Sequence, residues 1–209
     1  MVDVRREQSY RAGARMAQES MAQEAPELAE ALAGVEACDI VVVDGTYDHV
    51  ELVLGALGLP HQKVDPGALW RLSLRPHQLL VVNCPGEVDP RSIVQIREFV
   101  AAGGSLFTTD WALRHVIEPA FPGVVAYNEQ ATADAVVRVE VVDGDNRFLQ
   151  GVMAPGDDPQ WWLEASSYPI RILDTERVKV LLTSRQLGEQ WGEAAVAVVF
   201  AHGKARSST

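Results

Sequence analysis

Residues 90–113, PRSIVQIREFVAAGGSLFTTDWAL, contain the pattern that decides the fold. Pro90 is placed to start a helix, and the Gly103-Gly104 pair is placed to end it. The run SLFTTD (105–110) then predicts a strand, and the segment that begins at Trp111 predicts the next helix. This order is typical of a sheet whose parallel strands are joined by helices.

The same alternation runs through the preceding residues. Short apolar runs predict three earlier strands, DIVVVDG (39–45), HQKVD (61–65) and LLVVNC (79–84), and YDHVELVLGALG (47–58) predicts the helix that joins the first two. Strands that are apolar on both faces and separated by helices form parallel sheets covered on both sides. The sequence therefore predicts an α/β fold with a doubly wound, mostly parallel sheet.

Beyond Gly123 the alternation stops. Four further runs predict strands with few helices between them: AVVRVEVVDG (135–144), YPIRILD (168–174), RVKVLLTS (177–184) and AAVAVVFAHG (194–203). We expect these strands to form an antiparallel C-terminal extension of the sheet or its edge. We also expect the last of them to lie at an unprotected edge, since the chain stops soon after it.

Residues 1–37 predict an N-terminal helical extension, and residues 38–209 predict the α/β domain. Small or apolar side chains recur at helical spacing at Tyr10, Ala14, Ala17 and Met21, and a second short helix is bounded by Pro26 and Gly34. One interpretation is an arm packed on the domain surface. The other is an arm that docks on a protein partner or a second copy, because its apolar stripe is too small to form a core of its own.

Composition excludes several classes of partner. The chain has 209 residues, of which 47% are hydrophobic and 22% charged, and its formal net charge is -11. Because the chain has no basic field to neutralise phosphates, nucleic acid and anionic membrane surfaces are poor partners.

The sequence also lacks the signals of a membrane or secreted protein. The longest apolar run, residues 194–201, is far shorter than the roughly 20 residues of a membrane span. The amino end lacks the apolar core of a signal peptide. The two cysteines, Cys38 and Cys84, allow no disulfide framework or zinc spacing, so we expect a cytoplasmic protein.

Ligands of open parallel sheets bind outside the carboxyl ends of the strands. The residues at those ends are Asp44, Gly45, Thr46 and Tyr47 after the first strand, Asn83, Cys84, Pro85 and Gly86 after the third, and Thr109, Asp110 and Trp111 after the fourth. We expect them to bind a small polar ligand, contacted by Asp44, Thr46, Asn83 and Asp110, with Trp111 as the candidate for stacking. The alternative role of the two aspartates is to cap the helices that follow them.

Four segments resemble a known family. LLVVNCPGEV (79–88), IREFVAAGGSLFTTDWAL (96–113), DIVVVDG (39–45) and VAVVFAHGK (196–204) are similar to the class I glutamine-amidotransferase-like superfamily, nearest to its ThuA-like, trehalose-utilisation branch. The resemblance spans Asp39 to Lys204 and implies a flavodoxin-like wound sheet. Sequence segments of this kind are more specific for a fold than for an activity.

The resemblance also implies where a nucleophile would lie. Active members hold a cysteine at a sharp turn after the strand that follows the Gly-Gly pair, which here falls on Thr109, Asp110 and Trp111, and a histidine at the end of a later strand. This chain has no cysteine at the turn, and His202 falls in the region before the family's last strand, which we expect this domain to lack. Cys84 ends the preceding strand, and Pro85 after it has no N–H with which to stabilise an oxyanion. We therefore expect Cys84 to line a pocket and not to attack a substrate.

Other interpretations are weaker. A phosphoacceptor domain would need an aspartate where Asn83 stands, and a dinucleotide site would need more glycines than DGTYDHV (44–50) supplies. A metal could draw on Asp44, His49, Asp110 or His115, but no two of them have a diagnostic spacing. The pair Trp161-Trp162 could form a lid, anchor a partner or, more often, pack on the sheet.

The sequence thus favours a non-catalytic glutamine-amidotransferase-like domain that binds a small ligand or a protein and needs no cofactor or metal. The alternative is a ThuA-like hydrolase or carbohydrate-modifying enzyme that uses Asp110 or a metal in place of cysteine. A third hypothesis is a structural subunit with a vestigial pocket.

Overall fold

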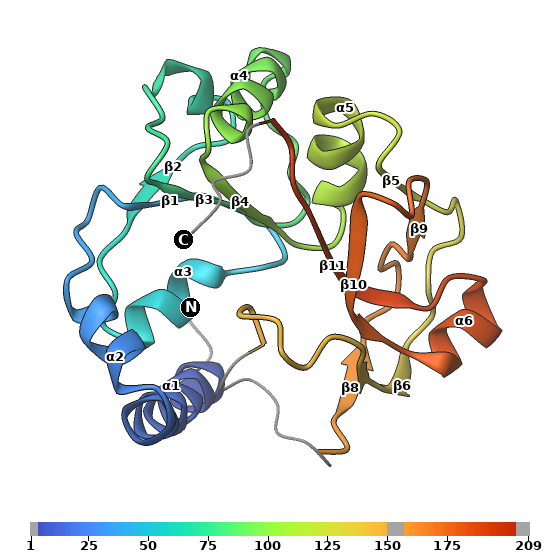
Figure 1. Ribbon diagram of the computed structural model, residues 1–209, viewed down its shortest axis with the longest axis horizontal. Helices are drawn as coiled ribbons and strands as arrows, with labels where there is room; N and C mark the ends of the chain where they lie inside the picture. Colours follow the sequence, from blue (N-terminus) through green and yellow to red (C-terminus); the bar gives the residue numbers. More distant parts are fainter. Residues whose placement is uncertain (1–3, 150–156, 204–209) are drawn as a thin grey trace.

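The computed structural model describes residues 4–149 and 157–203 (Figure 1). Its first half contains α1 (Val4–Glu24), α2 (Pro26–Ala33), β1 (Ile40–Val43), α3 (Val50–Ala56), β2 (Gln62–Val64), the 3-10 turn η1 (Leu69–Arg71), β3 (Leu79–Val82), α4 (Pro90–Ala101), β4 (Ser105–Thr108), the π-helical turn η2 (Leu113–Ile117) and α5 (Glu118–Ala120). The second half contains β5 (Val125–Tyr127), β6 (Ala135–Arg138), β7 (Glu140–Val141), β8 (Gln160–Leu163), β9 (Ile170–Ile172), β10 (Val178–Thr183), α6 (Arg185–Trp191) and β11 (Ala195–Phe200).

The first sheet is parallel and has the strand order β2-β1-β3-β4. Strands β1 and β3 run in register from Ile40 opposite Leu79 to Val43 opposite Val82. Every residue of β1 is buried, because helices cover both faces of the sheet. One face packs against α3, while the other packs against α4 and η2. This confirms the predicted parallel α/β character of the first half.

The second half is antiparallel. A five-stranded sheet has the order β5-β9-β11-β10-β7, and β6 pairs with β8 in a separate two-stranded sheet. The expectation that the last strand is an edge strand was wrong. Strand β11 lies between β10, where Val178 is opposite Phe200, and β9, where Ala195 is opposite Ile170. The two strands that precede it fold back on either side, which local sequence patterns do not reveal.

Some elements were missed by the sequence analysis. Strand β5 has only three residues, and β8 contains the tryptophan pair that we had considered for a lid, an anchor or a packed pair. Helix α6 was also missed, although the sequence contains both of its end signals. Ser184 caps the first turn by accepting from the N–H of Leu187, and Gly192 ends the helix at φ 84°.

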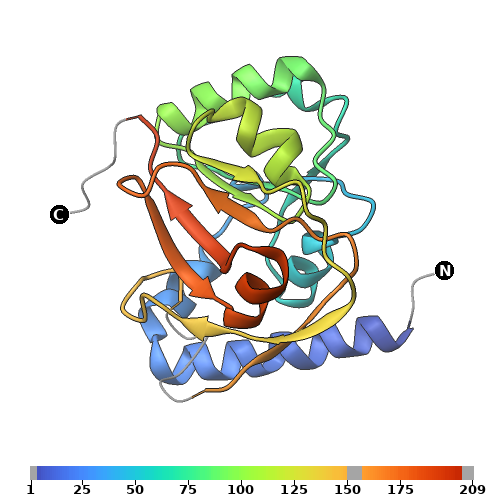
Figure 2. The ribbon, with the colours of Figure 1, turned by 90° about the vertical axis from the view of Figure 1, so that its right-hand side faces the viewer.

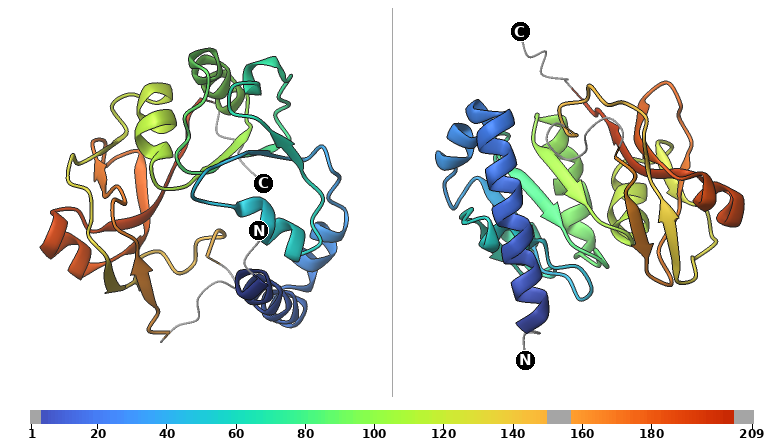
Figure 3. Two further views of the ribbon diagram at one scale, coloured as in Figure 1. Left: turned by 180° about the vertical axis from the view of Figure 1, so that it is seen from behind. Right: turned by 90° about the horizontal axis from the view of Figure 1, so that it is seen from below.

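The N-terminal arm packs on the domain. Helix α1 lies along α2 and α3, on the side of the parallel sheet that α3 covers (Figures 2 and 3). Ala14 is buried, Tyr10 and Met21 are partly buried, and Ala17 is exposed. The side chain of Gln18 donates to the carbonyl oxygen of Leu57 at 2.9 Å. In the described part of the chain, no helix is long and apolar enough to span a membrane.

Candidate functional site

The three strand ends predicted as a site do meet. The backbone N–H of Thr46 donates to the carbonyl oxygen of Cys84 at 3.0 Å, and the N–H of Cys84 donates to Oγ1 of Thr109 at 3.0 Å. A Cβ added to Gly45 would lie 2.5 Å from the Cβ of Asn83. Only glycine allows these loops to approach so closely. The loops after β1, β3 and β4 therefore form one continuous polar edge.

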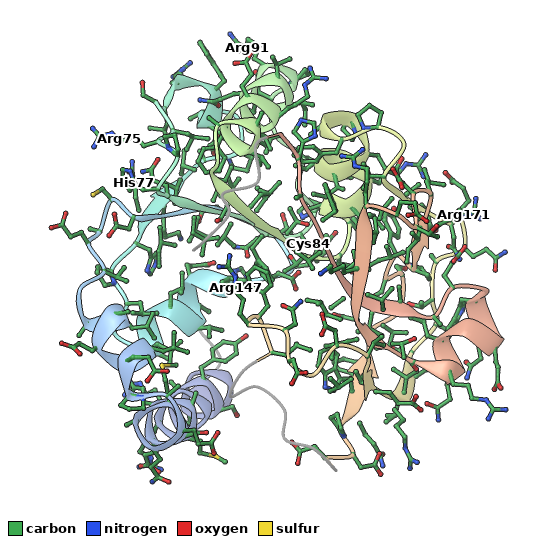
Figure 4. All side chains as sticks on the ribbon, in the orientation of Figure 1. Arg75, His77, Cys84, Arg91, Arg147 and Arg171 are labelled. Atoms are coloured by element: carbon green, nitrogen blue, oxygen red, sulfur yellow. The ribbon has the colours of Figure 1, made fainter. Side chains whose placement is uncertain are left out.

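A second glycine fixes the loop after β3. Gly86 has a φ of 76°, and a Cβ there would lie 2.7 Å from the Cβ of Ala112 at the start of η2. The carbonyl oxygen of Pro85 lies 2.9 Å from Nδ1 of His115, one turn further along. Pro85 and Gly86 are therefore held against the turn after β4. Figure 4 places Cys84, which precedes them, near the middle of the molecule between the parallel and antiparallel halves.

Asp110 forms the sharp turn between β4 and η2. Its φ of 39° is in the left-handed region, which residues other than glycine rarely adopt. Its Oδ1 accepts from the backbone N–H of Tyr168 at 2.8 Å, so the side chain reaches the loop between β8 and β9 and does not cap the following helix. Asp110 therefore stands at a strand-turn-helix corner.

Opposing effects act on the Asp110 carboxyl. Desolvation raises its pKa above the ordinary value of 3.8, and hydrogen bonds from the N–H of Tyr168 and the side chain of Ser167 partly lower it. The negative charges of Asp48 and Glu164 add to the rise. The pKa of Asp110 is therefore raised, in a negatively charged environment.

Strained backbone gathers around this turn. Among the described residues, only Asp110, Glu129 (φ 67°) and Ser166 (φ 72°) are non-glycine residues with positive φ. Trp111 Nε1 donates to the carbonyl oxygen of Ser166 at 2.6 Å, and Arg114 Nη1 donates to Glu129 Oε2 at 3.1 Å. Strain of this kind concentrates at functional sites, where surrounding contacts hold it in place.

Four aromatic rings form a row beside Asp110. The ring of Trp111 stacks on Tyr168 with centroids 5.4 Å apart, and Tyr168 stacks on Tyr127 at 3.8 Å. The ring of Tyr47 meets Trp111 edge-on at 5.2 Å. Tyr127 is buried, whereas Tyr47 is 59% exposed. The aromatic row thus runs from the interior to the surface, where Tyr47 is exposed and the carboxyl of Asp110 is partly desolvated by the 164–169 loop but still reaches solvent.

Cys84 is a poor nucleophile. Its side chain is buried, and desolvation raises the pKa of its thiol to about 11, although the backbone N–H of Trp111 acts against the rise. Its carbonyl oxygen already accepts from the N–H groups of Thr46 and Tyr47. In the described hydrogen bonds, His115 contacts Pro85 and no histidine contacts the thiol. The thiol therefore stays protonated at neutral pH.

Asn83 has a structural role. Its Nδ2 donates to Oε2 of buried Glu51 at 3.0 Å, and its Oδ1 accepts from the N–H of Val50 at 3.3 Å. The other carboxylate oxygen of Glu51 lies 3.1 Å from Nδ1 of His49. Asn83 thus supplies the hydrogen-bond acceptor for a backbone N–H in the first turn of α3. The N-cap residue of that helix, His49, makes no side-chain cap hydrogen bond.

Asp44 is also paired within the protein. Its Oδ1 lies 3.0 Å from Nζ of Lys63 on the neighbouring strand β2, and this contact raises the pKa of Lys63. Asp44 does not cap α3 either. In residues 4–149 and 157–203, no group of three or more His, Cys, Asp or Glu side chains is arranged to hold a metal.

Two further groups lie away from this edge. The ring of His202 packs edge-on against Phe121, with centroids 5.0 Å apart. Of the roles considered for the tryptophan pair, packing of the ring on the sheet does not fit Trp162, which is 68% exposed, whereas Trp161, opposite buried Val137, is 41% exposed. Strand β8 pairs with β6 in a separate two-stranded sheet.

Sequence analysis found the three loops but missed the fourth. The loop from Glu164 to Pro169 supplies Ser166, Ser167 and Tyr168, which contact Asp110 and Trp111 across more than fifty residues of sequence. No motif marks this loop, because its role depends on how the two halves pack.

Comparisons with known proteins identify no family. No protein-family model matches the chain, and no curated protein sequence matches it. Among solved structures, it is similar to a β-galactosidase from Rahnella sp. R3, with a TM-score of 0.49 and 16% identity, covering 86% of this chain and 30% of that one. It is also similar to a β-galactosidase from Bifidobacterium adolescentis, with a TM-score of 0.31 and 14% identity, covering 80% of this chain and 88% of that one. The chain thus spans less than a third of the Rahnella enzyme, and similarities this distant define no activity.

Proposed function

We propose that this chain is a glutamine-amidotransferase-like domain, nearest to the ThuA-like branch, that binds a small polar ligand without cysteine catalysis. The observation that carries the proposal is the left-handed turn at Asp110 after β4, which by the sequence resemblance would correspond to the family's nucleophile turn. The nearby thiol of Cys84 is buried and has a pKa of about 11. A left-handed strand-turn-helix corner whose residue accepts hydrogen bonds and cannot act as a thiolate supports binding without cysteine catalysis.

The exposed end of the aromatic row supplies the binding surface. A ring or planar group would stack near Tyr47 and Trp111, and Asp110 would accept hydrogen bonds from its hydroxyl or N–H groups. One oxygen of Asp110 is already held by the N–H of Tyr168, which orients the carboxylate. A rigid acceptor beside aromatic rings suits sugars, amides and nucleosides better than anions.

Tryptophan fluorescence tests the proposal, because Trp111 lies in the row. Titration with sugars, amides and nucleosides should change the emission with at least one of these compounds. Asp110→Asn keeps an oxygen for the Tyr168 N–H and tolerates positive φ, so it should stay folded but bind about tenfold more weakly, the equivalent of ~1.4 kcal/mol. Trp162→Phe is the matched control, since Trp162 lies on the separate sheet of β6 and β8, and it should bind normally.

Two results would contradict the binding proposal. One is the absence of any saturable change across the three compound classes with the folded protein. The other is an Asp110→Asn variant whose affinities equal those of the unaltered protein, which would remove Asp110 from the site.

A second candidate is a ThuA-like hydrolase or carbohydrate-modifying enzyme, favoured by the raised pKa of Asp110. A carboxyl that keeps its proton to higher pH can act as a general acid toward a leaving oxygen. Metal-assisted chemistry is less favoured, because Asp44 is paired with Lys63 and His49 with Glu51. Turnover of an amide or glycoside by the unaltered protein that is lost in Asp110→Asn would favour the enzymatic function. A stoichiometric metal that binds the unaltered protein and is lost in Asp110→Ala would favour metal-assisted chemistry.

A further inference from the structure

The loop of residues 164–169, which follows β8, is held by two different parts of the chain. Toward the candidate site, its backbone forms hydrogen bonds with the side chains of Asp110 and Trp111. Other hydrogen bonds join it to residues 128–134, the connection between β5 and β6. The shape of the loop therefore depends on a segment that is not one of the strand-end loops.

Thr132 makes four of the hydrogen bonds between these two segments. Its Oγ1 donates to the carbonyl oxygen of Glu164 at 3.0 Å and accepts from the N–H of Ser167 at 3.0 Å. Its backbone N–H donates to the carbonyl oxygen of Ser167 at 3.1 Å, and its carbonyl oxygen accepts from the N–H of Ser166 at 2.8 Å. Because Thr132 is only 6% exposed, water has little access to these bonds.

Four successive N–H groups of the loop donate to acceptors elsewhere in the protein. The first, that of Ala165, donates to Oδ1 of Asp134 at 3.1 Å, and the last, that of Tyr168, donates to Asp110. The two between them donate to Thr132. Thr132 therefore holds the backbone immediately before the N–H that Asp110 accepts, and so fixes the direction of that N–H.

Ser166 also depends on this restraint. Its φ of 72° is in the left-handed region, which residues other than glycine keep only where surrounding contacts hold them. Its N–H is bound by Thr132, and its carbonyl oxygen accepts from Nε1 of Trp111 at 2.6 Å. Loosening of the loop at Thr132 would let Ser166 relax and would move the acceptor of the Trp111 indole.

We propose that Thr132 is a positioning residue of the candidate site, which raises the ligand affinity of Asp110 and Trp111 by holding the loop after β8 in place. The inference rests on the binding function proposed above. Thr132 acts through the backbone of the loop and not by contact with a ligand. A hydroxyl is needed, because it donates to Glu164 and accepts from Ser167 at the same time. Serine can make both bonds, whereas valine, which has nearly the same shape, can make neither.

Hydrogen exchange tests the positioning without a ligand. In Thr132→Val, the amide of Tyr168 and the indole N–H of Trp111 should exchange about tenfold faster, relative to the amides of β1, which report global unfolding. Thr132→Ser should restore slow exchange. The matched control is Asp134→Ala, which removes the hydrogen bond to Ala165 at the other end of the loop and should leave the Tyr168 amide unchanged.

Two exchange results would overturn the proposal. One is a Tyr168 amide that exchanges equally in Thr132→Val and in the unaltered protein. The other is equal acceleration of that amide by Asp134→Ala. If Thr132→Val does not fold, Thr132→Ala removes the same hydroxyl with a smaller side chain, and the same comparisons apply.

Binding separates this inference from the function on which it rests. With a sugar, amide or nucleoside that the unaltered protein binds, Thr132→Val should bind about tenfold more weakly, whereas Thr132→Ser and Asp134→Ala should bind normally. Equal affinities of Thr132→Val and the unaltered protein would overturn the inference and leave the proposed function intact. Absence of binding by the unaltered protein would contradict the proposed function, while the exchange rates would still decide whether Thr132 positions the loop.

Discussion

Cys84 shows how surroundings decide the chemistry of a single residue. The same thiol at an exposed, electropositive turn would ionise readily, but here it is buried, and Asp110, Asp48 and Glu164 add negative charge around it. Its pKa rises from the ordinary value of 9.0 to about 11. Cys38, the other free cysteine, is exposed.

This pKa shift predicts a loss of stability in alkali. The unfolded thiol loses its proton near pH 9.0 and the folded thiol near pH 11, so the free energy of unfolding should be unaffected below pH 9 and fall between these values. Cys84→Ala should lack this component. Tyr127, whose pKa is also raised, remains in both proteins, so the difference between their urea unfolding curves isolates the thiol. Equal slopes against pH would contradict the prediction, as would selective labelling of Cys84 before Cys38 by iodoacetamide at neutral pH.

At the scale of elements, helix α3 depends on a side chain from a neighbouring strand. Asn83 follows β3 and accepts from the N–H of Val50, while its amide nitrogen holds the buried carboxylate of Glu51. A residue that we expected to contact a ligand therefore joins the sheet to the helix that covers it.

Removing this amide should destabilise the protein. Asn83→Ala leaves Val50 uncapped and Glu51 short of a donor, so the free energy of unfolding should fall by about 2–3 kcal/mol. Asn83→Asp places a second carboxylate beside Glu51 and should be worse at neutral pH but recover partly in mild acid. The control, Thr46→Ala, alters an exposed residue and should change the free energy by less than about 0.5 kcal/mol. An Asn83→Ala variant as stable as the control would show that water replaces the amide.

At the scale of the whole molecule, one core joins the two halves. The main cluster of buried residues includes Val41 and Leu80 of the parallel sheet, Tyr127 and Val178 of the antiparallel sheet, and Phe121 between them. The two halves should therefore unfold together, whereas α1 packs on the surface against α2 and α3, with Ala14 as the one fully buried side chain among its described residues.

Removing residues 1–24 should leave a folded domain. We expect one urea transition, coincident by circular dichroism and tryptophan fluorescence, and a loss of about 1–2 kcal/mol. Phe121→Ala, which opens a cavity in the shared core, should cost about 3–5 kcal/mol while keeping a single transition. Two separate transitions in either variant would show that the halves are independent domains.

Local sequence by itself determined the parallel half and the place of its polar edge. Strands buried on both faces need continuous apolar runs, and glycine and proline mark the ends of helices, so these features are visible over a few residues. The loops after β1, β3 and β4 meet because the carboxyl ends of parallel strands share one edge.

Tertiary structure alone decided the rest. It placed β11 inside its sheet, left Trp162 exposed on the small sheet of β6 and β8, and brought Tyr168 to Asp110 across 58 residues of sequence. The physical reason is that an apolar pattern indicates that a side chain will be buried but does not indicate which segment will bury it. The hydrogen bonds that hold the left-handed turn at Asp110 are likewise made by a distant loop, so the chemistry of that residue could not be deduced from its neighbours in the chain.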